Sequence, residues 1–564
     1  MLLTSKLLNE KIASCVRELW NVELPSDASV DFTRNYDHGD LTSTAAMRLA
    51  GVLRRPPARS AAELATAVLE LIRGDERLSP LVADAVPMGG FVNFTLSNRF
   101  WREFVAKVSS ERRAFGRSPS RGVKAQVEYV SANPTGPLTV AHGRQAAVGD
   151  TLCRILEAAG FEVQREYYLN DTGNQMRILG LSVYCRLMES RGRKVEFPDN
   201  CYQGDYIRDI AALAYEKMGD EILEMAQDEA VLRLGRFAGD YILGWIKEDL
   251  ADFRVGLDNY FSQQAMEESG LVERILERYR QSGKLYEKDG AVWLRSSEHG
   301  DSEDRVVVKS DGSYTYRTPD IAYHVDKFDR GFDWLIVLLG PDHHAHTITM
   351  KAALKALGYP SESLRHIIIQ HCTLYRGGEP LKMSTRRATY ITLREVMDAV
   401  GTDAARFFFL NRSSDSHLDF DLELAMKQAP DNPVFYLQYA SARCASILAK
   451  AHDDGLITDD EFVEGCFVPT QDVLEGMDYE EVRLSRALGR YSMVVEKAAL
   501  QTDQMRLINY LMEAVEFFHN YYQRRRVICD NRDESRSRLA VVSAFRQVLA
   551  NGLDLLGISA PVKM

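Results

Sequence analysis

The chain has 564 residues, of which 45% are hydrophobic and 27% are charged, a composition typical of a folded protein with several domains. Its 69 lysines and arginines are outnumbered by 81 aspartates and glutamates, and the net charge of −12 argues against a protein that grips nucleic acid through bulk positive charge. No stretch approaches the ~20 apolar residues of a membrane helix, and eight scattered cysteines without a CxxC pair disfavour a thiolate zinc site or a secreted disulfide framework. We therefore expect a cytoplasmic protein without a membrane span.

Residues 1–118 predict a small α+β domain. The chain begins with an amphipathic helical pattern, passes through a Gly/Asp turn at residues 38–40 and reaches the run GGFVNFTLS, which indicates a short strand. A linker-like run follows, in which five basic residues between 112 and 124 outnumber the single acid Glu111. Contact with a polyanion and an ordinary solvated linker are equally compatible with that run.

Residues 119–400 predict a doubly wound parallel sheet. A β-rich run from residue 125, a Pro/Gly loop, a helix of about 20 residues and a second β-rich run form a βαβ unit. Further strands are expected at 334–339 and 365–370 with a helix between them, and an acidic helical segment from about 185 to 290 is expected as an insertion. A helical stem over 401–445 and an all-helical domain over 446–564 are predicted to follow.

Two loops have the composition of phosphate-binding segments. The first, Ser131 to Arg144, joins a strand to a helix N-terminus, where backbone N–H groups and the helix dipole favour anions, and His142 and Arg144 could add donors. The second, Leu381 to Arg387, holds one lysine, small polar residues and two arginines, which suit a clamp on a phosphate chain. Each loop alone is weak evidence, because a lone histidine is usually structural and exposed basic loops are common.

Together the two loops resemble the two signature sequences of class I aminoacyl-tRNA synthetases. Flanking segments narrow the resemblance to arginyl-tRNA synthetases and extend it from end to end: VEYVSANPTGPL, YYLNDTGNQM, SDGSYTYRTPDIAYHVDKF, LGPDHHAH, DNPVFYLQYASARCASIL and RQVLANGLDLLGISAPVKM. The resemblance implies a Rossmann catalytic domain with a connective insertion, an N-terminal domain at the tRNA elbow and a helical anticodon-binding domain. The implied reaction joins ATP and L-arginine into arginyl-adenylate and then transfers arginine to the 3′-terminal adenosine of tRNA(Arg).

The resemblance also implies an arginine pocket. A planar guanidinium is bound best by carboxylates in fork geometry, and Glu128 and Asp320 are the candidates. Tyr316 would pack on the guanidinium plane, while Ser131 and Asn133 would hold the α-amino and carboxylate ends. A lone acidic residue is more often a surface or capping residue, but the motif context reverses that interpretation here.

Adenylation needs no protein nucleophile, because the substrate carboxylate attacks the α-phosphorus, so catalysis rests on positioning and charge stabilisation. His142 and Lys382 are expected to meet the phosphates, together with Thr139 and Arg386, and Mg²⁺ is expected to accompany ATP. The residues expected at the nucleotide are Gly143, Asp342, His343, Met383 and Ser384. A zinc ion on the nearby histidines His343, His344 and His346 is disfavoured, since they lack a carboxylate-rich or HxxxH frame.

For tRNA, aromatic side chains that stack on bases and basic side chains that meet phosphates are the expected features. The predicted anticodon-side patch consists of Tyr521, Tyr522, Arg524, Arg525 and Arg526. Phe91, Asn93 and Phe94 hold the analogous place in the N-terminal domain, at the tRNA elbow as the resemblance implies. A tyrosine pair on a helix is otherwise usually part of a core.

The first signature departs from the family pattern, because Thr139 stands for its opening histidine and Ala141 for its glycine, and the second ends in Thr385 rather than lysine. These departures leave the rate of adenylation in doubt more than the identity of the substrate. They leave open the alternative that the chain is a synthetase-like protein that binds tRNA or arginine without catalysing adenylation. A Rossmann dehydrogenase is disfavoured, since no GxGxxG follows the first strand. The expected partners are tRNA(Arg), L-arginine and ATP, and a monomer is expected.

Overall fold

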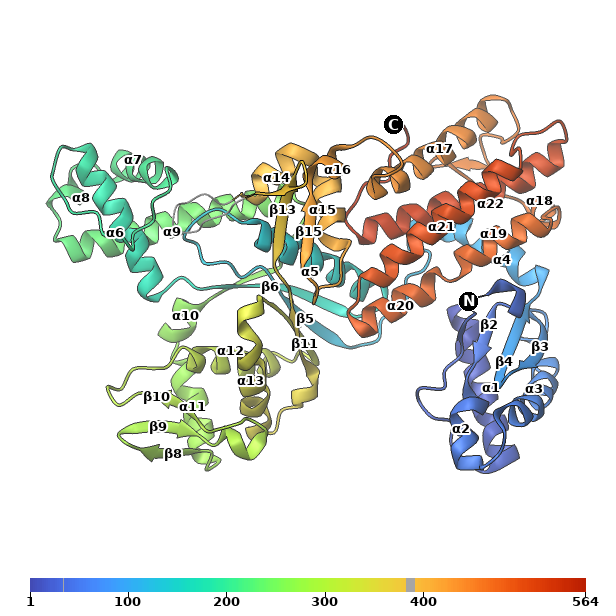
Figure 1. Cartoon of the computed structure of the whole chain (residues 1–564), viewed down its shortest axis with the longest axis horizontal. Helices are drawn as coiled ribbons and strands as arrows, with labels where there is room; N and C mark the ends of the chain where they lie inside the picture. Colours follow the sequence, from blue (N-terminus) through green and yellow to red (C-terminus); the bar gives the residue numbers. More distant parts are fainter. Residues whose placement is uncertain (34, 382–390) are drawn as a thin grey trace.

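The computed structural model describes the chain except for residues 34 and 382–390. Figure 1 shows an elongated molecule built around a central parallel sheet. The N-terminal domain and the C-terminal helices lie on one side of that sheet, and a helical insertion and a small antiparallel sheet lie on the other. Among the helices of the described residues, none is both long and apolar enough to cross a membrane.

The N-terminal domain has the predicted α+β arrangement. Its elements are α1 (Leu2–Trp20), β1 (Asp31–Phe32), β2 (Leu41–Ser43), α2 (Ala45–Leu53), α3 (Pro57–Arg73), β3 (Val82–Met88), β4 (Phe91–Leu96) and α4 (Asn98–Glu111). The strands form an antiparallel sheet in the order β1-β2-β4-β3. β3 and β4 form a hairpin whose turn is Gly89-Gly90, where both φ angles are positive and glycine is the least strained residue.

Residues 124–368 contain the predicted parallel sheet. The elements of the sheet and its covering helices are β5 (Lys124–Glu128), α5 (Val140–Ala158), β6 (Glu162–Leu169), β7 (Asn259–Ser262), α12 (Arg317–Asp329), β11 (Trp334–Leu339), α13 (His344–Ala356) and β12 (Leu364–Ile368). The strand order is β12-β11-β5-β6-β7, and every neighbouring pair is parallel. The chain leaves β5 toward β6 and returns on its other side through β11, so the strand order reverses between β5 and β11. Ligands of open α/β sheets bind at the carboxyl ends of the strands at such a reversal.

The segment between β6 and α12 is helical only in its first half. Helices α6 (Gly173–Ser190), α7 (Tyr206–Met218), α8 (Glu221–Glu224) and α9 (Gln227–Asp252) form the insertion. The expected helical run to about 290 is wrong beyond Asp252, because β7, α10 (Gln263–Glu268), α11 (Leu271–Gln281) and an antiparallel sheet of β8 (Leu285–Lys288), β9 (Ala291–Leu294) and β10 (Arg305–Val308) follow. The Asp289-Gly290 turn between β8 and β9, where both φ values are positive, is typical of a β-hairpin. The hairpin was not predicted because the acidic composition of the whole segment suggested helices.

The C-terminal region is mainly helical, as predicted. It comprises β13 (Cys372–Arg376), β14 (Glu379–Pro380), α14 (Leu393–Val400), α15 (Thr402–Leu410), β15 (Leu418–Asp421), α16 (Leu422–Met426), α17 (Pro433–Asp453), β16 (Phe462–Val463), β17 (Cys466–Phe467), α18 (Gln471–Glu475), α19 (Tyr479–Gly489), α20 (Tyr491–Gln501), α21 (Met505–Arg524) and α22 (Arg532–Leu555). Two features break the all-helical expectation after residue 401: β15, which pairs in parallel with β13, and the short β16–β17 hairpin.

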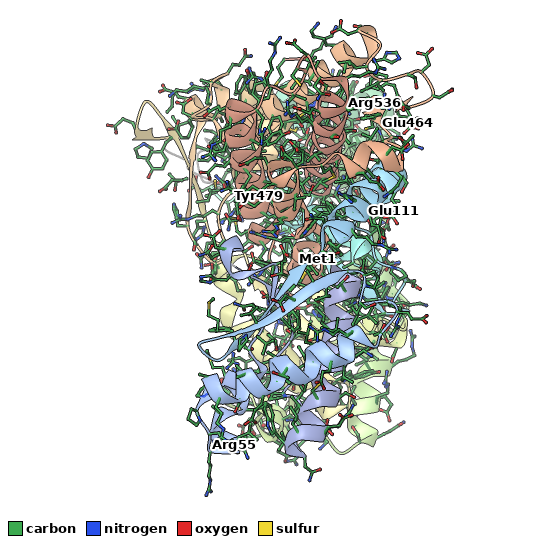
Figure 2. The ribbon with its side chains drawn as sticks, turned by 90° about the vertical axis from the view of Figure 1, so that its right-hand side faces the viewer. Met1, Arg55, Glu111, Glu464, Tyr479 and Arg536 are labelled. Atoms are coloured by element: carbon green, nitrogen blue, oxygen red, sulfur yellow. The ribbon has the colours of Figure 1, made fainter. Side chains whose placement is uncertain are left out.

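The N-terminal domain docks on the C-terminal helices, and Figure 2 shows Met1 and Glu111 at this boundary. Helix α4 packs against α19 and α22, and Trp101 of α4 is completely buried. A Cβ on Gly489 would lie 2.7 Å from the Trp101 ring, so the glycine lets the two helices approach closely. Arg486 of α19 lies 3.1 Å from the carboxylate of Asp40.

Candidate active site

Three helix N-termini meet at the carboxyl edge of the parallel sheet. Helix α5 follows β5 and α13 follows β11, so both begin where those strands end. Helix α12 runs toward the start of β11, and Asp320 in its first turn hydrogen-bonds His346 in the first turn of α13. Free backbone N–H groups and helix dipoles therefore converge at one place, which favours the binding of an anion.

The turn after β5 has an unusual backbone. Val130 and Ser131 have φ values of 69° and 40°, a left-handed region that a β-branched residue rarely adopts. The N–H of Ser131 donates to the Tyr129 carbonyl at 3.0 Å, which closes the turn. The Ser131 hydroxyl donates to Oε1 of Glu128 at 3.2 Å and accepts the N–H of Tyr168 at 3.0 Å. Strained backbone of this kind concentrates at functional sites, and here it orients the Glu128 carboxylate.

Glu128 ends β5 and is almost completely buried, with 7% of its surface exposed. The Nζ atom of Lys327, a fully buried residue of α12, donates to its Oε2 atom at 2.6 Å. This lysine was not among the residues expected at the site. Because Asp320 and Lys327 are seven residues apart, they share one face of α12, and that spacing could have indicated it.

Asp320 lies between two histidines. Its Oδ1 atom is 3.3 Å from Nδ1 of His324, and its Oδ2 atom is hydrogen-bonded to Nε2 of His346. Burial acts to raise the pKa of Asp320, but the hydrogen bonds and charges of the two imidazoles outweigh it and hold the pKa well below its usual range. Among the described lysines and arginines, none forms an ion pair with Asp320.

Glu128 and Asp320 lie close enough to the same tyrosine to perturb it. Burial first, and then the charges of Asp320 and Glu128, raise the pKa of Tyr168 on β6. The two carboxylates thus share one end of the sheet, but their partners differ. Glu128 is held by a buried ammonium group, whereas Asp320 is held only by imidazoles, so Asp320 is the carboxylate better able to accept an incoming guanidinium.

Two other residues expected around arginine lie nearby. Tyr316, at the N-terminus of α12, is 70% exposed, and its ring stacks on His346 at a centroid distance of 6.2 Å and an angle of 25°. Asn133 donates through Nδ2 to Oε1 of Gln175, in the first turn of α6, at 2.6 Å. Tyr316 is therefore linked to Asp320 through the His346 ring.

His142 lies in the first turn of α5. Its Nδ1 atom accepts the backbone N–H of Thr139 at 3.2 Å, and the Thr139 hydroxyl lies at the same distance. Burial lowers the pKa of His142 to about 4, so the ring is neutral near pH 7. Because Nδ1 accepts a hydrogen bond, the single ring proton is assigned to Nε2, which can donate to a ligand.

Two further residues of the same helix pack closely against its neighbours. Gly143 is buried, and a Cβ there would lie 2.8 Å from Leu393 and 3.1 Å from Phe409, so this glycine lets α5 pack closely on α14 and α15. Arg144 is fully buried and donates to the backbone carbonyls of Gln370, Ser413 and Ser416 at 2.7 to 3.0 Å. Its guanidinium is therefore committed to the fold and not to phosphates.

The second signature lies outside the described residues, which include neither Lys382, Met383, Ser384 nor Arg386. The described chain that follows it is anchored at the N-terminus of α5: Leu393 N donates to the carbonyl of Leu138 at 2.8 Å, and Thr392 bridges to Thr139. Asp342 is exposed in the 3-10 turn after β11, and the side chain of His343 is outside the described part.

The residues expected at the tRNA elbow lie on opposite faces of β4. Phe94 is completely buried against the helices of its domain, so its predicted contact with tRNA is wrong. Phe91 is half-buried, whereas Asn93, on the same face as Phe91, is 7% exposed and accepts a hydrogen bond from Thr42 at 2.6 Å. Strand alternation places Phe91 and Asn93 on the face opposite Phe94, since neighbouring residues point to opposite sides.

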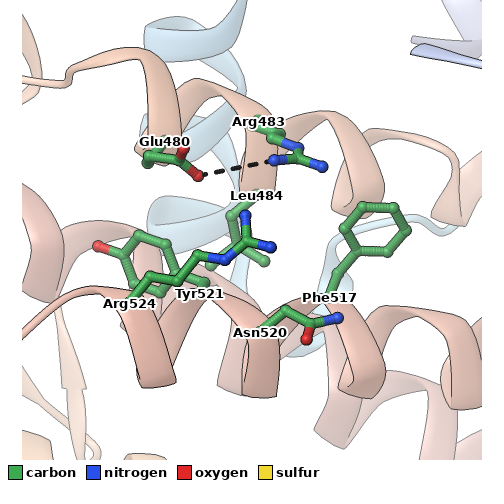
Figure 3. Close-up of a pocket in the computed structure, with 7 residues that line it drawn as sticks. All are labelled: Glu480, Arg483, Leu484, Phe517, Asn520, Tyr521 and Arg524. Carbon is green, nitrogen blue, oxygen red and sulfur yellow. Dashed lines mark ion pairs between the residues drawn. The ribbon is translucent and has the colours of Figure 1, made fainter.

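The predicted anticodon-side patch is likewise divided. Tyr521 is 4% exposed and its hydroxyl donates to Glu481 at 2.7 Å, so it belongs to the core and its predicted stacking role is wrong. Arg525 pairs with Asp478 at 3.0 Å, whereas Arg524 is exposed. Figure 3 shows Arg524 lining a small pocket between α19 and α21 together with Arg483, Phe517 and Asn520.

An aromatic cluster beside this patch was not expected from the sequence. Tyr436 lies 4.9 Å from His519, and Tyr439 stacks on the same ring at 6.3 Å. The guanidinium of Arg443 lies over Tyr439 at 5.0 Å and over Tyr522 at 4.7 Å. These half-buried rings and the guanidinium between α17 and α21 form a platform of the kind on which unpaired bases stack. The spacing of Tyr436 and Tyr439, three residues apart in FYLQY, places both rings on one side of a helix and could have indicated this cluster.

Comparison with known protein families gives one consistent result. The family described as tRNA synthetases class I (R), catalytic domain, matches residues 105–419. The arginyl tRNA synthetase N terminal domain matches residues 6–96, and the DALR anticodon binding domain matches residues 437–564.

Individual proteins agree with these matches. The chain is 43% identical to an arginine–tRNA ligase of Geobacter sp. (strain M21) over 96% of this chain and 95% of the relative. It is 45% identical to that of Syntrophotalea carbinolica, with the same two coverages. Of solved structures, the arginyl-tRNA synthetase of Thermus thermophilus shares the fold, with a TM-score of 0.78 and 23% identity, over 99% of this chain and 100% of that one.

Proposed function

This chain belongs to the arginyl-tRNA synthetase family and is an arginine–tRNA ligase, and on that premise we propose how its own residues divide the work. The observation that carries the proposal is that α12 brings Asp320 and Glu128 to the same sheet edge, because it contains Asp320 and also Lys327, which binds Glu128 at 2.6 Å. ATP and arginine react there to give arginyl-adenylate and pyrophosphate, and arginine is then transferred to the 3′-terminal adenosine of tRNA.

Arginine is recognised from α12 and the turn after β5. Asp320 accepts the guanidinium in fork geometry, because the described chain gives it no competing ammonium or guanidinium partner. Tyr316, exposed beside His346, covers the guanidinium plane. Glu128 supplies a second fixed negative charge, and Ser131 and Asn133 hold the α-amino and carboxylate groups.

The phosphates are met by the N-terminus of α5. His142 donates from Nε2 to the triphosphate, and Thr139 sets the orientation of the ring through its backbone N–H. Lys382 and Arg386 meet the charge that develops on pyrophosphate, and Asp342, His343, Met383 and Ser384 contribute to the nucleotide site.

Mg²⁺ accompanies ATP. The described residues contain no group of three or more side chains able to cage a metal ion, which fits an ion carried mainly by the triphosphate and water. When bound, it would neutralise part of the phosphate charge. Asp342, exposed after β11, is the carboxylate of the nucleotide site that could approach it.

Transfer RNA is held at two places along the docked terminal domains. Phe91 and Asn93 face the elbow, and Arg524, Arg526 and Tyr522 lie at the anticodon side with Arg525 in a lesser role. The platform of Tyr436, Tyr439, His519 and Arg443 supplies the stacking surface that Tyr521 cannot. Phosphate contacts set the register, and unpaired bases are read by stacking.

The protein acts in the cytoplasm as a monomer. All eight cysteines are free and seven of them are buried, which suits a reducing compartment. Sedimentation of the purified chain tests whether it is a monomer. A mass of twice 63.7 kDa or more would contradict the proposal.

Exchange of radiolabelled pyrophosphate into ATP tests the whole assignment. The purified chain should catalyse exchange that requires both arginine and tRNA(Arg). If exchange is absent with matched tRNA while arginine and tRNA still bind, the assignment of these residues to adenylation is overturned.

A further inference from the structure

Lys327 is a buried cation without an assigned role. It is fully buried, its Nζ atom lies 2.6 Å from Oε2 of Glu128, and the same atom lies 4.1 Å from the centre of the Tyr323 ring. Burying an ammonium group is costly unless it is paired, so the position of Lys327 is tied to the carboxylate it meets. That carboxylate is one of the two proposed to recognise arginine.

The next cation along the chain is committed to other carboxylates. Arg330, the C-cap residue of α12, pairs with Glu166 at 2.7 Å and with Asp326 at 2.9 Å, and Glu166 is completely buried. Within the described chain, Lys327 is the cation that Glu128 has as an ion-pair partner. The ionisable groups facing Glu128 are Lys327 and Tyr323 from α12 and Tyr168 and Glu166 from β6, and Glu166 lies opposite Glu128 in the strand register.

The second oxygen of Glu128 is set by the strained turn. Ser131 donates to Oε1 at 3.2 Å while Lys327 holds Oε2, so the carboxylate is fixed at both ends. Without the ammonium group, Oε2 of this buried carboxylate would lose its charged partner, and the plane of the carboxylate would no longer be fixed.

We propose that Lys327 is a positioning residue for arginine recognition, which holds the Glu128 carboxylate in a fixed plane without touching the substrate itself. The proposal rests on the assignment of Glu128 to the arginine site. Helix α12 then supplies both Asp320, which meets the guanidinium, and the cation that prepares the opposite carboxylate. Binding of arginine would thus depend on a side chain two helical turns away from Asp320.

Steady-state aminoacylation by Lys327→Met, with saturating ATP and tRNA, is the first test. The KM for arginine should rise about tenfold or more, while the KM for ATP and the Kd for tRNA stay within about twofold. A purely structural role would lower stability and leave the KM for arginine unchanged.

Arg330→Met is the matched control, since it removes a cation from the same helix that pairs with Glu166 and not with Glu128. It should reduce stability with little change in the KM for arginine. If Arg330→Met and Lys327→Met raise that KM equally, the effect is a general disturbance of α12 and the proposal is overturned.

If Lys327→Met alone folds poorly, the double variant Glu128→Gln/Lys327→Met provides a second test. The double variant removes both buried charges together and leaves neither of them unpaired. Its KM for arginine should equal that of Glu128→Gln, since Lys327 acts only through Glu128. A further rise in the double variant overturns the proposal. If Asp320→Asn raises the KM for arginine and Lys327→Met does not, this inference fails while the proposed arginine site stands; if neither does, the site itself is wrong.

Discussion

The Nδ1 atom of His142 accepts the backbone N–H of Thr139 at 3.2 Å, across the first turn of α5. This single hydrogen bond leaves the ring proton on Nε2, and burial, which lowers the pKa to about 4, keeps the ring neutral. Thr139 thus orients the His142 ring through its backbone N–H, which any residue other than proline would provide at that position. The threonine that stands here in place of the usual histidine therefore keeps this hydrogen bond.

His142→Ala should lower the rate of arginine-dependent pyrophosphate exchange by roughly 10²-fold, because one donor to the developing phosphate charge is lost. His142→Gln should retain part of the rate, since its amide nitrogen can reach the position of Nε2. The affinity for tRNA, measured by filter binding, serves as the control and should not change. An unaltered turnover number in His142→Ala would remove this residue from the mechanism.

Asp320→Asn should raise the KM for arginine by about 10- to 100-fold, since a charge-assisted hydrogen bond to the guanidinium is worth about 1.5–3 kcal/mol. The measurement is aminoacylation at varied arginine with ATP and tRNA saturating. The KM for ATP should stay the same, because Asp320 has no proposed contact with the nucleotide. If the KM for arginine of Asp320→Asn equals that of the wild type, Asp320 does not bind arginine and serves only to hold His324 and His346.

The regular parts of the catalytic fold could be predicted because they depend on local patterns. The runs that became β5, α5 and β6 show the apolar periodicity and the Pro/Gly loop of a βαβ unit, and β11 was located at its exact ends, Trp334 and Leu339. The β8–β9 hairpin was missed because acidic residues around the Asp289-Gly290 turn resembled the helical insertion before it. Composition averaged over a long segment hides a change of element within it.

The partners of the site residues could not be predicted, because they depend on contacts between distant parts of the chain. Glu128 and Asp320 were both identified, but Lys327 pairs with a residue 199 positions away in the sequence. The burial of Tyr521 and Phe94 has the same origin, since an aromatic residue on a helix or strand can face either the core or the solvent. The packing of α19 on α21 decides that Tyr521 faces the core, and the packing of β4 on the helices of its domain decides the same for Phe94.

Arg524→Ala and Arg526→Ala should weaken tRNA binding and flatten its dependence on salt, each by about one unit of the logarithmic slope if one phosphate contact is lost. Arg525→Ala should have a smaller effect, because that guanidinium already pairs with Asp478 at 3.0 Å. Binding isotherms over a series of salt concentrations give the slopes. Equal slopes for all three variants and the wild type would place the phosphate contacts elsewhere.

Glu481 of α19 is a buried carboxyl group, 2% exposed, that accepts hydrogen bonds from the Tyr521 hydroxyl at 2.7 Å and the Asp478 N–H at 3.0 Å. Burial and the neighbouring Asp478 raise its pKa to about 7, from 4.5. The folded protein therefore holds a proton that the unfolded chain releases. The contribution of Glu481 to the free energy of unfolding is full below pH 4.5, is lost as the pH rises to about 7, and is constant above that.

Glu481→Gln should remove this loss, because an amide keeps the acceptor for Tyr521 and does not ionise. Unfolding by urea should show a gain of roughly 1–3 kcal/mol at pH 8 and a smaller change in stability across the titration range. Glu480→Gln, at the neighbouring position where the side chain is 24% exposed, is the matched control and should leave the pH dependence as it is. If Glu481→Gln instead lowers stability at pH 8, the ionised carboxylate stabilises the folded protein through Arg538, whose Nε lies 3.9 Å from its Oε1 atom, and its pKa is not raised.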